Sequence, residues 1–336
     1  MNARDKYWRT PFHVAAAQGA VECVELLEPK IGNINITDRA GRSGLHHACY
    51  AGHISMVSQL SSVLAKLYIL TFKVRFLVER GANVNALDKK ERRPLHWAAH
   101  QGSDEAVRLL VAAGADISAS DKEQYTALHA AAAAGNLGVV SALLELGASV
   151  EVVNRAGNTP LHTAVINGQV DVVQEMLEVE GMRLDLTNHL GHTALHLAAA
   201  ATHSEACLRL LLAEGAEVRA RACDGRTVLH LAAIHGRLAR IELLVKAGAK
   251  VDERDRQGRT ALHIAAYHGH ELLVASLVLH GADVDMGDHA GLTPLHMAAA
   301  AGRLEAARKL ISAGAKVMLP CQKTILASCS RVVDWL

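Results

Sequence analysis

A four-residue motif, Thr-x-Leu-His with close variants, recurs nine times along this 336-residue chain. Its histidines follow one another at intervals of 33 or 34 residues, apart from one interval of 50 residues. They are His13, His46, His96, His129, His162, His196, His230, His263 and His296. A fixed period of this length predicts an array of stacked repeats, in which each unit packs mainly against its neighbours.

Each repeat carries the same local signals around its histidine. In eight of the nine units a Thr or Ser precedes the histidine by three residues and can cap the helix that follows; Arg93 is the exception. Six residues after the histidine, eight of the nine units have a glycine, which can close a helix in the left-handed conformation. A second amphipathic segment then ends in Gly-Ala. One unit is therefore expected to be a finger-like loop, a helix, a glycine turn and a second helix.

This unit resembles the ankyrin repeat, whose signature begins Thr-Pro-Leu-His, as at 159–162 and 293–296. The resemblance implies an all-α solenoid of about nine stacked helix-turn-helix repeats with short β-hairpin fingers. It also implies that each histidine bonds backbone between adjacent units, which is a structural role and not a catalytic one. We expect one array over 1–318, followed by a divergent tail over 319–336. The expected repeats are approximately 7–39, 40–89, 90–122, 123–155, 156–189, 190–223, 224–256, 257–289 and 290–318.

The interval of 50 residues equals one repeat plus 17 residues and indicates an insertion. Removing 58–74 restores the usual distance between Gly52 and Gly81. Three interpretations are open: an alternative exon or translated intron, a protrusion that docks a partner, or a membrane segment, which Lys66 and Lys73 disfavour. We expect the insertion to lengthen the second helix of its repeat or to bulge outward.

The charge balance, 35 basic against 34 acidic residues, gives no electrostatic signature of a nucleic-acid or membrane partner. The N-terminus lacks the apolar segment of a secretory signal. The cysteines form no Cys-x-x-Cys pair, which favours reduced, buried thiols and a cytoplasmic or nuclear location. They are Cys23, Cys49, Cys207, Cys223, Cys321 and Cys329.

Sequence motifs of catalysis are missing: there is no P-loop, nucleophile elbow, kinase signature or His-Glu-x-x-His. The pair His268 and His270, followed by Glu271, has too few further ligands for zinc. We therefore expect no enzyme activity, metal or cofactor. Asn85, with Leu77 eight residues before it, resembles ankyrin sites of asparagine hydroxylation, so the array could also be a substrate.

The fingers differ most between repeats and carry the candidate partner-binding residues. These are Arg39, Arg42, Lys89, Lys90, Arg92, Arg93, Trp97, Lys122, Tyr125, Arg155, Arg221, Arg226, Arg254 and Arg256. Two interpretations are open. The row is either a solvated surface with local Asp–Arg pairs or the binding surface for an acidic segment, with Trp97 as an aromatic anchor beside Lys89–Arg93.

Six stretches, in this order, carry a narrower resemblance: DRAGRSGLHHA at 38–48, DKKERRPLHWAA at 88–99, GNTPLH at 157–162, THSEACLRLL at 202–211, LHLAAIHGR at 229–237 and IAAYHGHELL at 264–273. They resemble the long ankyrin-repeat regulatory subunits of protein phosphatase 6. That resemblance implies a noncatalytic scaffold that joins a phosphatase and its adaptor and guides substrates to them. We expect protein partners and a monomeric array within a complex. The alternatives are an adaptor for a signalling or cytoskeletal partner, or the ankyrin region of a larger enzyme or channel.

Overall fold

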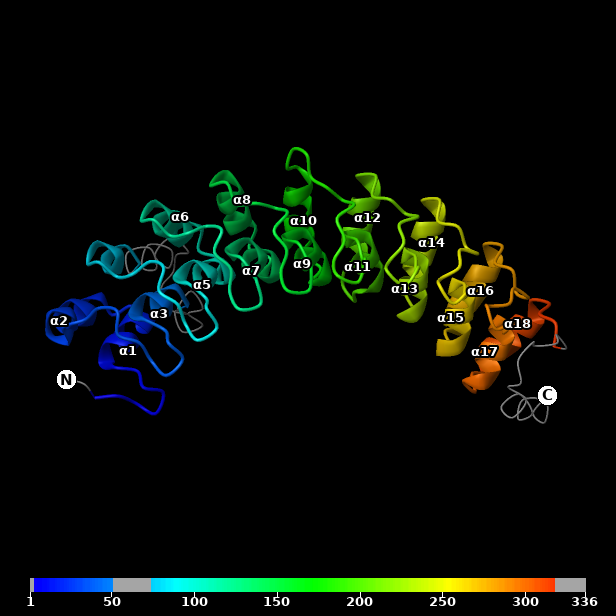
Figure 1. Cartoon of the computed structure of the whole chain (residues 1–336), viewed down its shortest axis with the longest axis horizontal. Helices are drawn as coiled ribbons and strands as arrows, with labels where there is room; N and C mark the ends of the chain where they lie inside the picture. The colour runs from blue at the N-terminus through cyan, green and yellow to red at the C-terminus, as the bar shows by residue number, and fades with distance from the viewer. Residues whose placement is uncertain (1–2, 51–73, 318–336) are drawn as a thin grey trace, which may run out of the picture. The chain divides into compact units, whose positions relative to one another are not determined.

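A computed structural model describes residues 3–50 and 74–317 (Figure 1). The chain divides into two compact units, residues 1–182 and 183–336. The predicted insertion at 58–74, apart from Val74, and the predicted tail at 319–336 lie outside the described residues.

Unit 1 is built from helix pairs in two layers. Its first-layer helices are α1 (Pro11–Gln18), α3 (Gly44–Tyr50), α5 (Pro94–Gln101), α7 (Ala127–Ala134) and α9 (Pro160–Ile166). Its second-layer helices are α2 (Val21–Ile31), α6 (Asp104–Ala112), α8 (Leu137–Glu145) and α10 (Val170–Leu177). Residues 74–79 form a further helical segment between α3 and α5 in the sequence. First-layer helices pack on one another in chain order, as α6, α8 and α10 do in the second layer.

Unit 2 repeats this arrangement. Its first layer contains α11 (Ala194–Ala200), α13 (Val228–Ile234), α15 (Ala261–His268) and α17 (Pro294–Ala300). Its second layer contains α12 (Glu205–Ala213), α14 (Leu238–Lys246), α16 (Glu271–Leu279) and α18 (Leu304–Ser312). The predicted all-α architecture of stacked helix-turn-helix repeats is thus confirmed within each unit.

The core follows from the small residues of the first-layer helices. Ala98, Ala99 and Ala131 are completely buried, and their short side chains let adjacent helices approach closely. The second-layer helices fill the space behind them with larger side chains such as Leu110 and Leu143, which are also completely buried. Burial of each such leucine stabilises the stack by about 2 kcal/mol.

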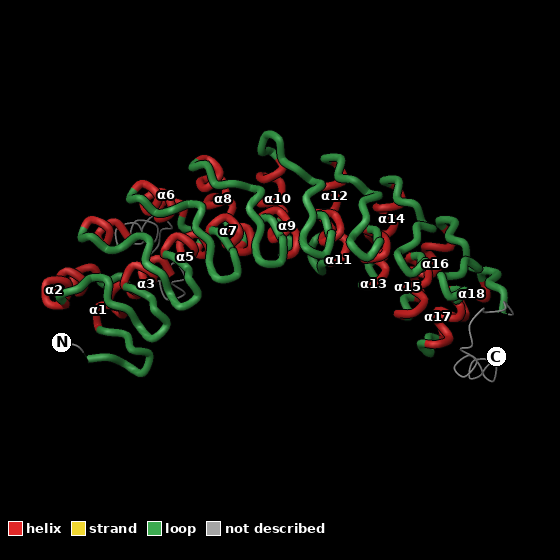
Figure 2. The backbone as a smooth tube through the Cα atoms, viewed as in Figure 1, coloured by secondary structure: helices red, strands yellow, loops and turns green. Residues whose placement is uncertain are grey.

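The fingers are the polar loops between one repeat and the next, and in unit 1 they lie on one side of the first-layer helices (Figure 2). They were expected to be β-hairpins. Within the described residues they are tight turns with isolated antiparallel bridges, Thr37 to Ser43 and Ser120 to Thr126. The reason is local: an Asp or Asn side chain at the start of the turn accepts backbone N–H groups that a longer ladder would use.

The sixth repeat closes its first helix without glycine. Helix α11 is followed by Ala201, whose backbone is extended (φ −64°, ψ 155°), and not by a left-handed glycine. The guanidinium of Arg240, a buried residue of α14, donates to the carbonyls of Ala198 (2.8 Å), Ala199 (2.9 Å) and Thr202 (3.0 Å). A neighbouring repeat therefore satisfies the helix end that a glycine turn closes elsewhere.

Candidate interaction surface

The motif histidines use both ring nitrogens for structure. In the fourth repeat, Nδ1 of His129 accepts from the backbone N–H (3.3 Å) and hydroxyl (2.9 Å) of Thr126. Its Nε2–H donates to the carbonyl of Asn158 in the next finger (2.9 Å). Burial lowers the pKa of His129, although the Asn158 carbonyl opposes the shift, so the ring is neutral. A ring held in this way has no nitrogen left for catalysis.

The same bond to the next finger recurs at 2.9–3.0 Å in five further repeats and at 3.4 Å in the sixth repeat. Burial lowers the pKa of the histidine in each of these repeats. The residues are His13, His46, His96, His230 and His263, with His196 as the longer case. A contact repeated in this way connects each of these seven repeats to the next one within its unit.

Arg93, which stands where the other eight repeats have Thr or Ser, forms hydrogen bonds within the protein. Its guanidinium donates to Oδ1 of Asn85 and Oδ2 of Asp116, both at 3.1 Å. The Asn85 amide also donates to the Gly114 carbonyl (2.9 Å), and its Oδ1 accepts the Asp116 N–H (3.0 Å). Arg93 and Asn85, both singled out from the sequence, therefore join two successive fingers.

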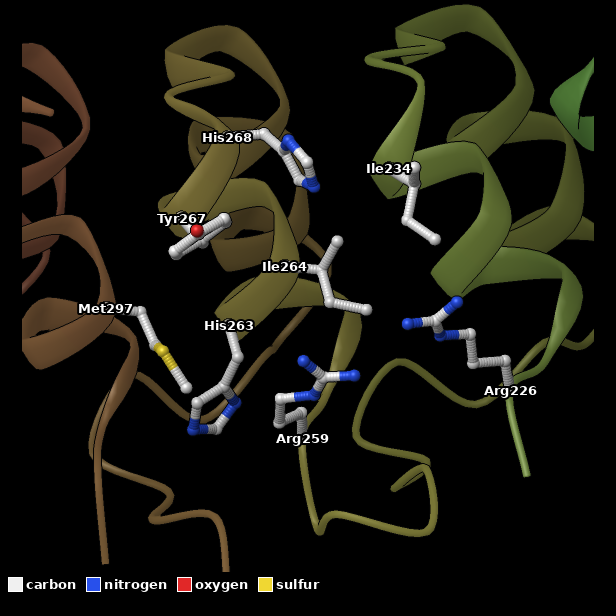
Figure 3. A pocket seen from close by; sticks show the side chains of 8 residues that line it. All are labelled: Arg226, Ile234, Arg259, His263, Ile264, Tyr267, His268 and Met297. Atoms are coloured by element: carbon white, nitrogen blue, oxygen red, sulfur yellow. The ribbon is translucent and has the colours of Figure 1, made fainter. Parts of the chain in front are cut away.

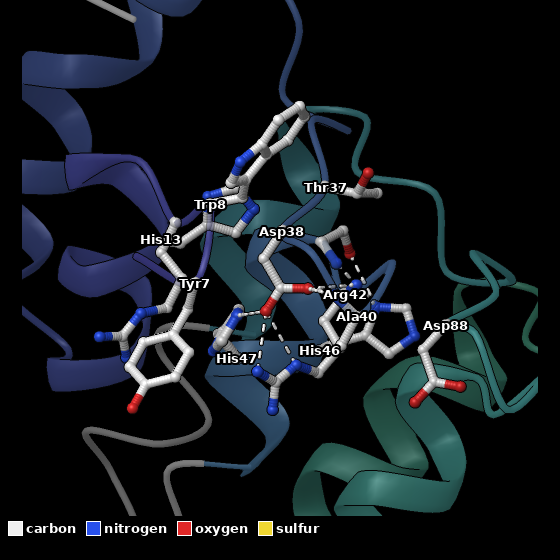
Figure 4. Close-up of polar contacts among 12 residues, drawn as sticks. Tyr7, Trp8, His13, Thr37, Asp38, Ala40, Arg42, His46, His47 and Asp88 are labelled. Atoms are coloured by element: carbon white, nitrogen blue, oxygen red, sulfur yellow. Dashed lines mark hydrogen bonds and ion pairs between the residues drawn. The ribbon is translucent and has the colours of Figure 1, made fainter. Parts of the chain in front are cut away.

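Each Asp-x-x-x-Arg finger contains an internal ion pair, as Figure 4 shows for Asp38. Asp38 Oδ1 accepts the N–H groups of Ala40 (2.8 Å) and Arg42 (2.9 Å), and Oδ2 accepts from the Arg42 guanidinium (2.8 Å) and His47 Nε2 (3.1 Å). Burial alone would raise the pKa of Asp38, but the Arg42 bonds outweigh it and lower that pKa. Burial lowers the pKa of His47 to about 4, so His47 is a neutral donor.

The pairing recurs at Arg92 with Asp88 (2.9 Å) and at Arg259 with Asp255 (2.8 Å). Arg42 and Arg92, two of the predicted binding residues, are thus neutralised by their own fingers. Each keeps 28–30% of its side chain exposed.

Trp97 lies beneath the finger surface. It is 9% exposed, the Arg92 guanidinium lies 4.0 Å from its ring centroid, and the ring of Tyr50 meets it edge-on at 5.0 Å. Tyr50 itself is 49% exposed, so Tyr50 and not Trp97 presents the aromatic surface here. Sequence reasoning missed Tyr50; its place four residues after the motif histidine, on the first-layer helix, was the available signal.

The remaining predicted residues of unit 1 lie along the fingers. One position at the finger tips is basic and exposed in four fingers, as Arg39, Lys89, Lys122 and Arg155. Lys90, which follows Lys89, is also exposed. Tyr125 is half-buried, with its ring centroid 5.3 Å from that of His129.

In unit 2, two predicted arginines connect fingers to one another. Arg221 donates to the carbonyls of Gly225 (3.2 Å) and Arg254 (2.7 Å) and pairs with Glu253. Arg254, one repeat later, donates to the carbonyls of Gly258 (3.0 Å) and Gly287 in the same way. These contacts occupy both side chains, whereas Arg256 is exposed.

A cavity of about 460 Å³ opens on the first-layer helices of unit 2 (Figure 3). Its apolar lining is Ile234, Ile264, Tyr267 and Met297, and its polar lining is Arg226, Arg259, His263 and His268. The Arg226 guanidinium faces this space (Figure 3); it pairs with Asp224 at 3.2 Å, and its Nε is buried without a partner in the part of the chain that the structure describes. The cavity can take an apolar side chain next to an acidic one.

Within residues 3–50 and 74–317, no group of three or more His, Cys, Asp or Glu side chains could hold a metal ion. His268 and His270 stack with their ring centroids 5.8 Å apart, and His270 Nε2 donates to the Ile234 carbonyl (3.3 Å). Over the same ranges, no helix combines the length and apolarity needed to cross a bilayer.

The expectation that the cysteines are buried is wrong for two of them. Cys49 and Cys207 are buried, but Cys23 and Cys223 are exposed. The two exposed thiols lie on the solvent side of α2 and at a finger tip, positions that spacing in the sequence does not distinguish. Cys321 and Cys329 lie outside the described residues.

Comparison with known families supports the same architecture. A model described as ankyrin repeats (3 copies) matches residues 1–68, 161–255 and 241–321, and one described as ankyrin repeats (many copies) matches 95–144 and 128–177. The chain belongs to the ankyrin-repeat family. Ankyrin repeats are protein-interaction modules, so protein binding follows as its general function.

Individual relatives match shorter stretches. A probable 26S proteasome regulatory subunit p28 of Saccharomyces cerevisiae is 31% identical, over 30% of this chain and 53% of its own length. A transient receptor potential cation channel subfamily A member 1 homolog of Caenorhabditis elegans is 30% identical, over 32% of this chain and 9% of its own. Among solved structures, the ankyrin repeat domain of human ASB11 has a TM-score of 0.59 at 27% identity, covering 68% of this chain and 100% of that domain. The chain thus spans about half or less of the length of these curated relatives.

Proposed function

We propose that this protein is a noncatalytic scaffold that serves as a regulatory, substrate-targeting subunit of a serine/threonine protein phosphatase of the phosphatase 6 type. The observation that carries the scaffold role is the cavity of unit 2, which combines apolar side chains with Arg226 on the first-layer helices. The phosphatase assignment rests on the resemblance of six stretches to that family's regulatory subunits: 38–48, 88–99, 157–162, 202–211, 229–237 and 264–273.

The cavity suits a partner side chain better than a small substrate. Tyr267 is 51% exposed, and Met297 and Ile234 are partly exposed, so the apolar surface is accessible from solvent. His263, the cavity's motif histidine, has Nδ1 bonded to Thr260 (2.9 Å) and Nε2 bonded to the Leu292 carbonyl (3.0 Å). The site therefore offers shape, an apolar surface and a guanidinium, which are the elements of recognition.

The test is co-expression of the full chain with the phosphatase 6 catalytic subunit and its adaptor, followed by affinity capture. We expect both to be recovered, and recovery to fall with Tyr267→Ala. Leu279→Ala, at an 85% exposed site on second-layer helix α16, is the matched control and should leave the recovery of both proteins unchanged. Failure to recover either protein rejects the phosphatase assignment and leaves the ankyrin scaffold. A parallel capture with a chain lacking 58–74 tests whether the insertion contributes.

A second candidate is the ankyrin region of a larger enzyme or channel, or an adaptor for a signalling or cytoskeletal partner. The observation that favours it is that the channel relative matches this chain over 9% of its own length. Full-length transcript sequencing that finds a kinase, ligase or membrane segment in the same reading frame would select this candidate over the first.

A further inference from the structure

The first residue after the turn Asp or Asn is basic in all five described fingers of unit 1. We call these five residues the tip row; they are Lys6, Arg39, Lys89, Lys122 and Arg155. All five are exposed. In unit 2 the same position carries His189, Cys223, Arg256 and His289, so the uninterrupted basic row belongs to unit 1.

Backbone hydrogen bonds between fingers fix the spacing of the tip row. The N–H groups of Arg39, Lys89, Lys122 and Arg155 donate to the finger before each of them, at 2.8–3.0 Å. The accepting carbonyls belong to Tyr7, Ala40, Lys90 and Glu123. Each basic side chain therefore leaves the protein from an equivalent, anchored backbone position, and the row advances by one repeat at each step.

The charge of the tip row is not neutralised by its own fingers. Arg9, Arg42 and Arg92 lie three residues further on and pair with the turn Asp. In contrast, no acidic side chain among the described residues pairs with Lys6, Arg39, Lys89 or Lys122, and Arg155 reaches exposed Glu123 at 3.9 Å. Apart from Asp5, which pairs with Arg9, the exposed tips with Lys90 carry six positive charges against two negative ones, Glu91 and Glu123. Such a row attracts acidic groups.

The N-terminal end of the row is aromatic. Tyr7 is 50% exposed and Trp8 is 53% exposed. Trp8 has φ of 64°, at the turn position where the next finger has Gly41 with φ of 79°. The left-handed backbone conformation of Trp8 destabilises the fold by about 1 kcal/mol, and it leaves the large indole ring in solvent. The Arg4 guanidinium lies 4.8 Å from the Trp8 ring centroid, so this end also carries positive charge.

We propose that the tip row binds an extended, acidic segment of a partner protein, with a carboxylate side chain at every third residue. Packed repeats lie about 10 Å apart, and an extended chain advances about 3.3 Å per residue, so three residues span one repeat. At one end of the segment, an apolar side chain packs on Tyr7 and Trp8. This inference rests on the proposed scaffold function and adds the chemistry of the bound segment.

A peptide fits the row better than a nucleic acid. Glu91 and Glu123 are exposed among the basic side chains and would repel a continuous phosphate backbone. They repel an acidic peptide less, since the residues between its carboxylates can be uncharged and can lie next to Glu91 and Glu123. The net charge of the whole chain, +1, also lacks the excess that nucleic-acid binding uses.

The experiment is fluorescence anisotropy of a labelled peptide with Asp at every third position, titrated with the full chain. A peptide of the same composition with its Asp residues at every second position is the register control. We expect the in-register peptide to bind about fivefold more tightly. We expect the triple variant Arg39→Glu, Lys89→Glu, Lys122→Glu to weaken its binding at least about tenfold. Lys30→Glu, an exposed site on α2, should change it less than about twofold.

Equal binding of the two peptides, or a triple variant that binds as well as the parent, overturns the proposal. Tighter binding of a single-stranded oligonucleotide of equal charge also overturns it. Circular dichroism of the triple variant shows whether the fold is kept; if it is lost, Lys89→Glu alone replaces it. Phosphatase capture separates the two proposals: peptide binding in register without capture rejects the phosphatase role only, and capture without peptide binding rejects the tip row only.

Discussion

At the scale of single residues, the motif histidine explains both the repeat and the absence of chemistry at its most recurrent position. Thr126 fixes the tautomer of His129 by donating to Nδ1, which leaves the Nε2 proton for the Asn158 carbonyl. Because the donated proton crosses to the next finger, one side chain stabilises two repeats. The histidine therefore contributes more to folding stability than a single hydrogen bond within its own repeat would.

Replacing His129 by Ala should lower stability by about 3 kcal/mol, because it removes the Nε2 donor that connects this repeat to the Asn158 carbonyl and leaves a small cavity behind. The measurement is the urea midpoint of the full chain. His100→Ala, an exposed site one repeat earlier, is the control and should cost less than about 0.5 kcal/mol. An equal shift of the urea midpoint in both variants would contradict the structural role of His129.

Stability should fall as the pH is lowered from 7 to 5. Burial, with His192 adding to it, lowers the pKa of His196 from 6.5 to about 4. The unfolded chain then binds a proton below pH 6.5 that the folded chain refuses until about pH 4, so the native state loses stability in that window. His196 alone contributes about 2 kcal/mol between pH 7 and pH 5.

The measurement is the thermal midpoint across this range for the parent chain and for His196→Gln. The variant starts from a lower midpoint but should show a shallower dependence on pH. An identical slope in both proteins would mean that His196 is not protonated differently on unfolding.

Sequence reasoning succeeded for contacts that recur and was less informative for contacts made once. The period located every motif histidine, because each repeat solves the same packing problem. It could not show that Arg92 covers Trp97, or that Arg93 spans Asn85 and Asp116, because those contacts depend on side-chain directions in two successive fingers. Candidate binding residues such as Arg92 and Arg93 are therefore engaged in contacts within the protein, which the sequence alone could not show.

At the scale of secondary-structure elements, helix ends distinguish the repeats. Most first-layer helices meet a left-handed glycine, whereas α11 has Thr202 at that place and relies on Arg240 of α14. The sequence showed the missing glycine but not its replacement, since the guanidinium comes from the next repeat, 38–42 residues away.

Arg240→Ala should therefore destabilise unit 2 by about 3 kcal/mol, because three carbonyls lose a charged donor in a buried site. Hydrogen exchange of the full chain should quicken in α11 and α13 while α5 and α7 stay as in the parent. Arg209→Ala, which removes an exposed arginine paired with Glu205, is the control and should change little. Equal exchange in the parent and in Arg240→Ala would show that the helix end does not need this donor.

Two glycines with similar backbones separate conformational strain from steric conflict. Gly135 and Gly147 have φ of 79° and 87°. A Cβ on Gly135 would meet the Gln169 amide oxygen, whereas one on Gly147 meets no atom within 4 Å. Gly147→Ala should cost about 1 kcal/mol through strain alone. Gly135→Ala should cost about 1 kcal/mol more, because Gln169 must leave its bond to the Ala133 carbonyl. Equal urea midpoints for the two variants would contradict this difference.

At the scale of the whole molecule, the repeat frame is regular and the surface on it is not. Unit 1 presents the basic tip row and the exposed ring of Tyr50, whereas unit 2 presents the cavity with its apolar lining. Composition predicted neither, because a net charge of +1 conceals a local basic row. Ile264, Tyr267 and Met297 lie on two first-layer helices, α15 and α17, and the repeat period does not distinguish them from core positions.

The central claim is that partners bind the fingers and first-layer helices. Hydroxyl-radical footprinting of the full chain, alone and in complex with the captured phosphatase or with any other purified protein partner, tests it directly. The account predicts that complex formation protects Tyr267 and Met297, which line the cavity, or Tyr7 and Trp8, which end the tip row. Leu272 and Leu279, exposed on second-layer helix α16, should be oxidised as before. Protection of Leu272 and Leu279 with no change at the cavity or the tip row would contradict the claim.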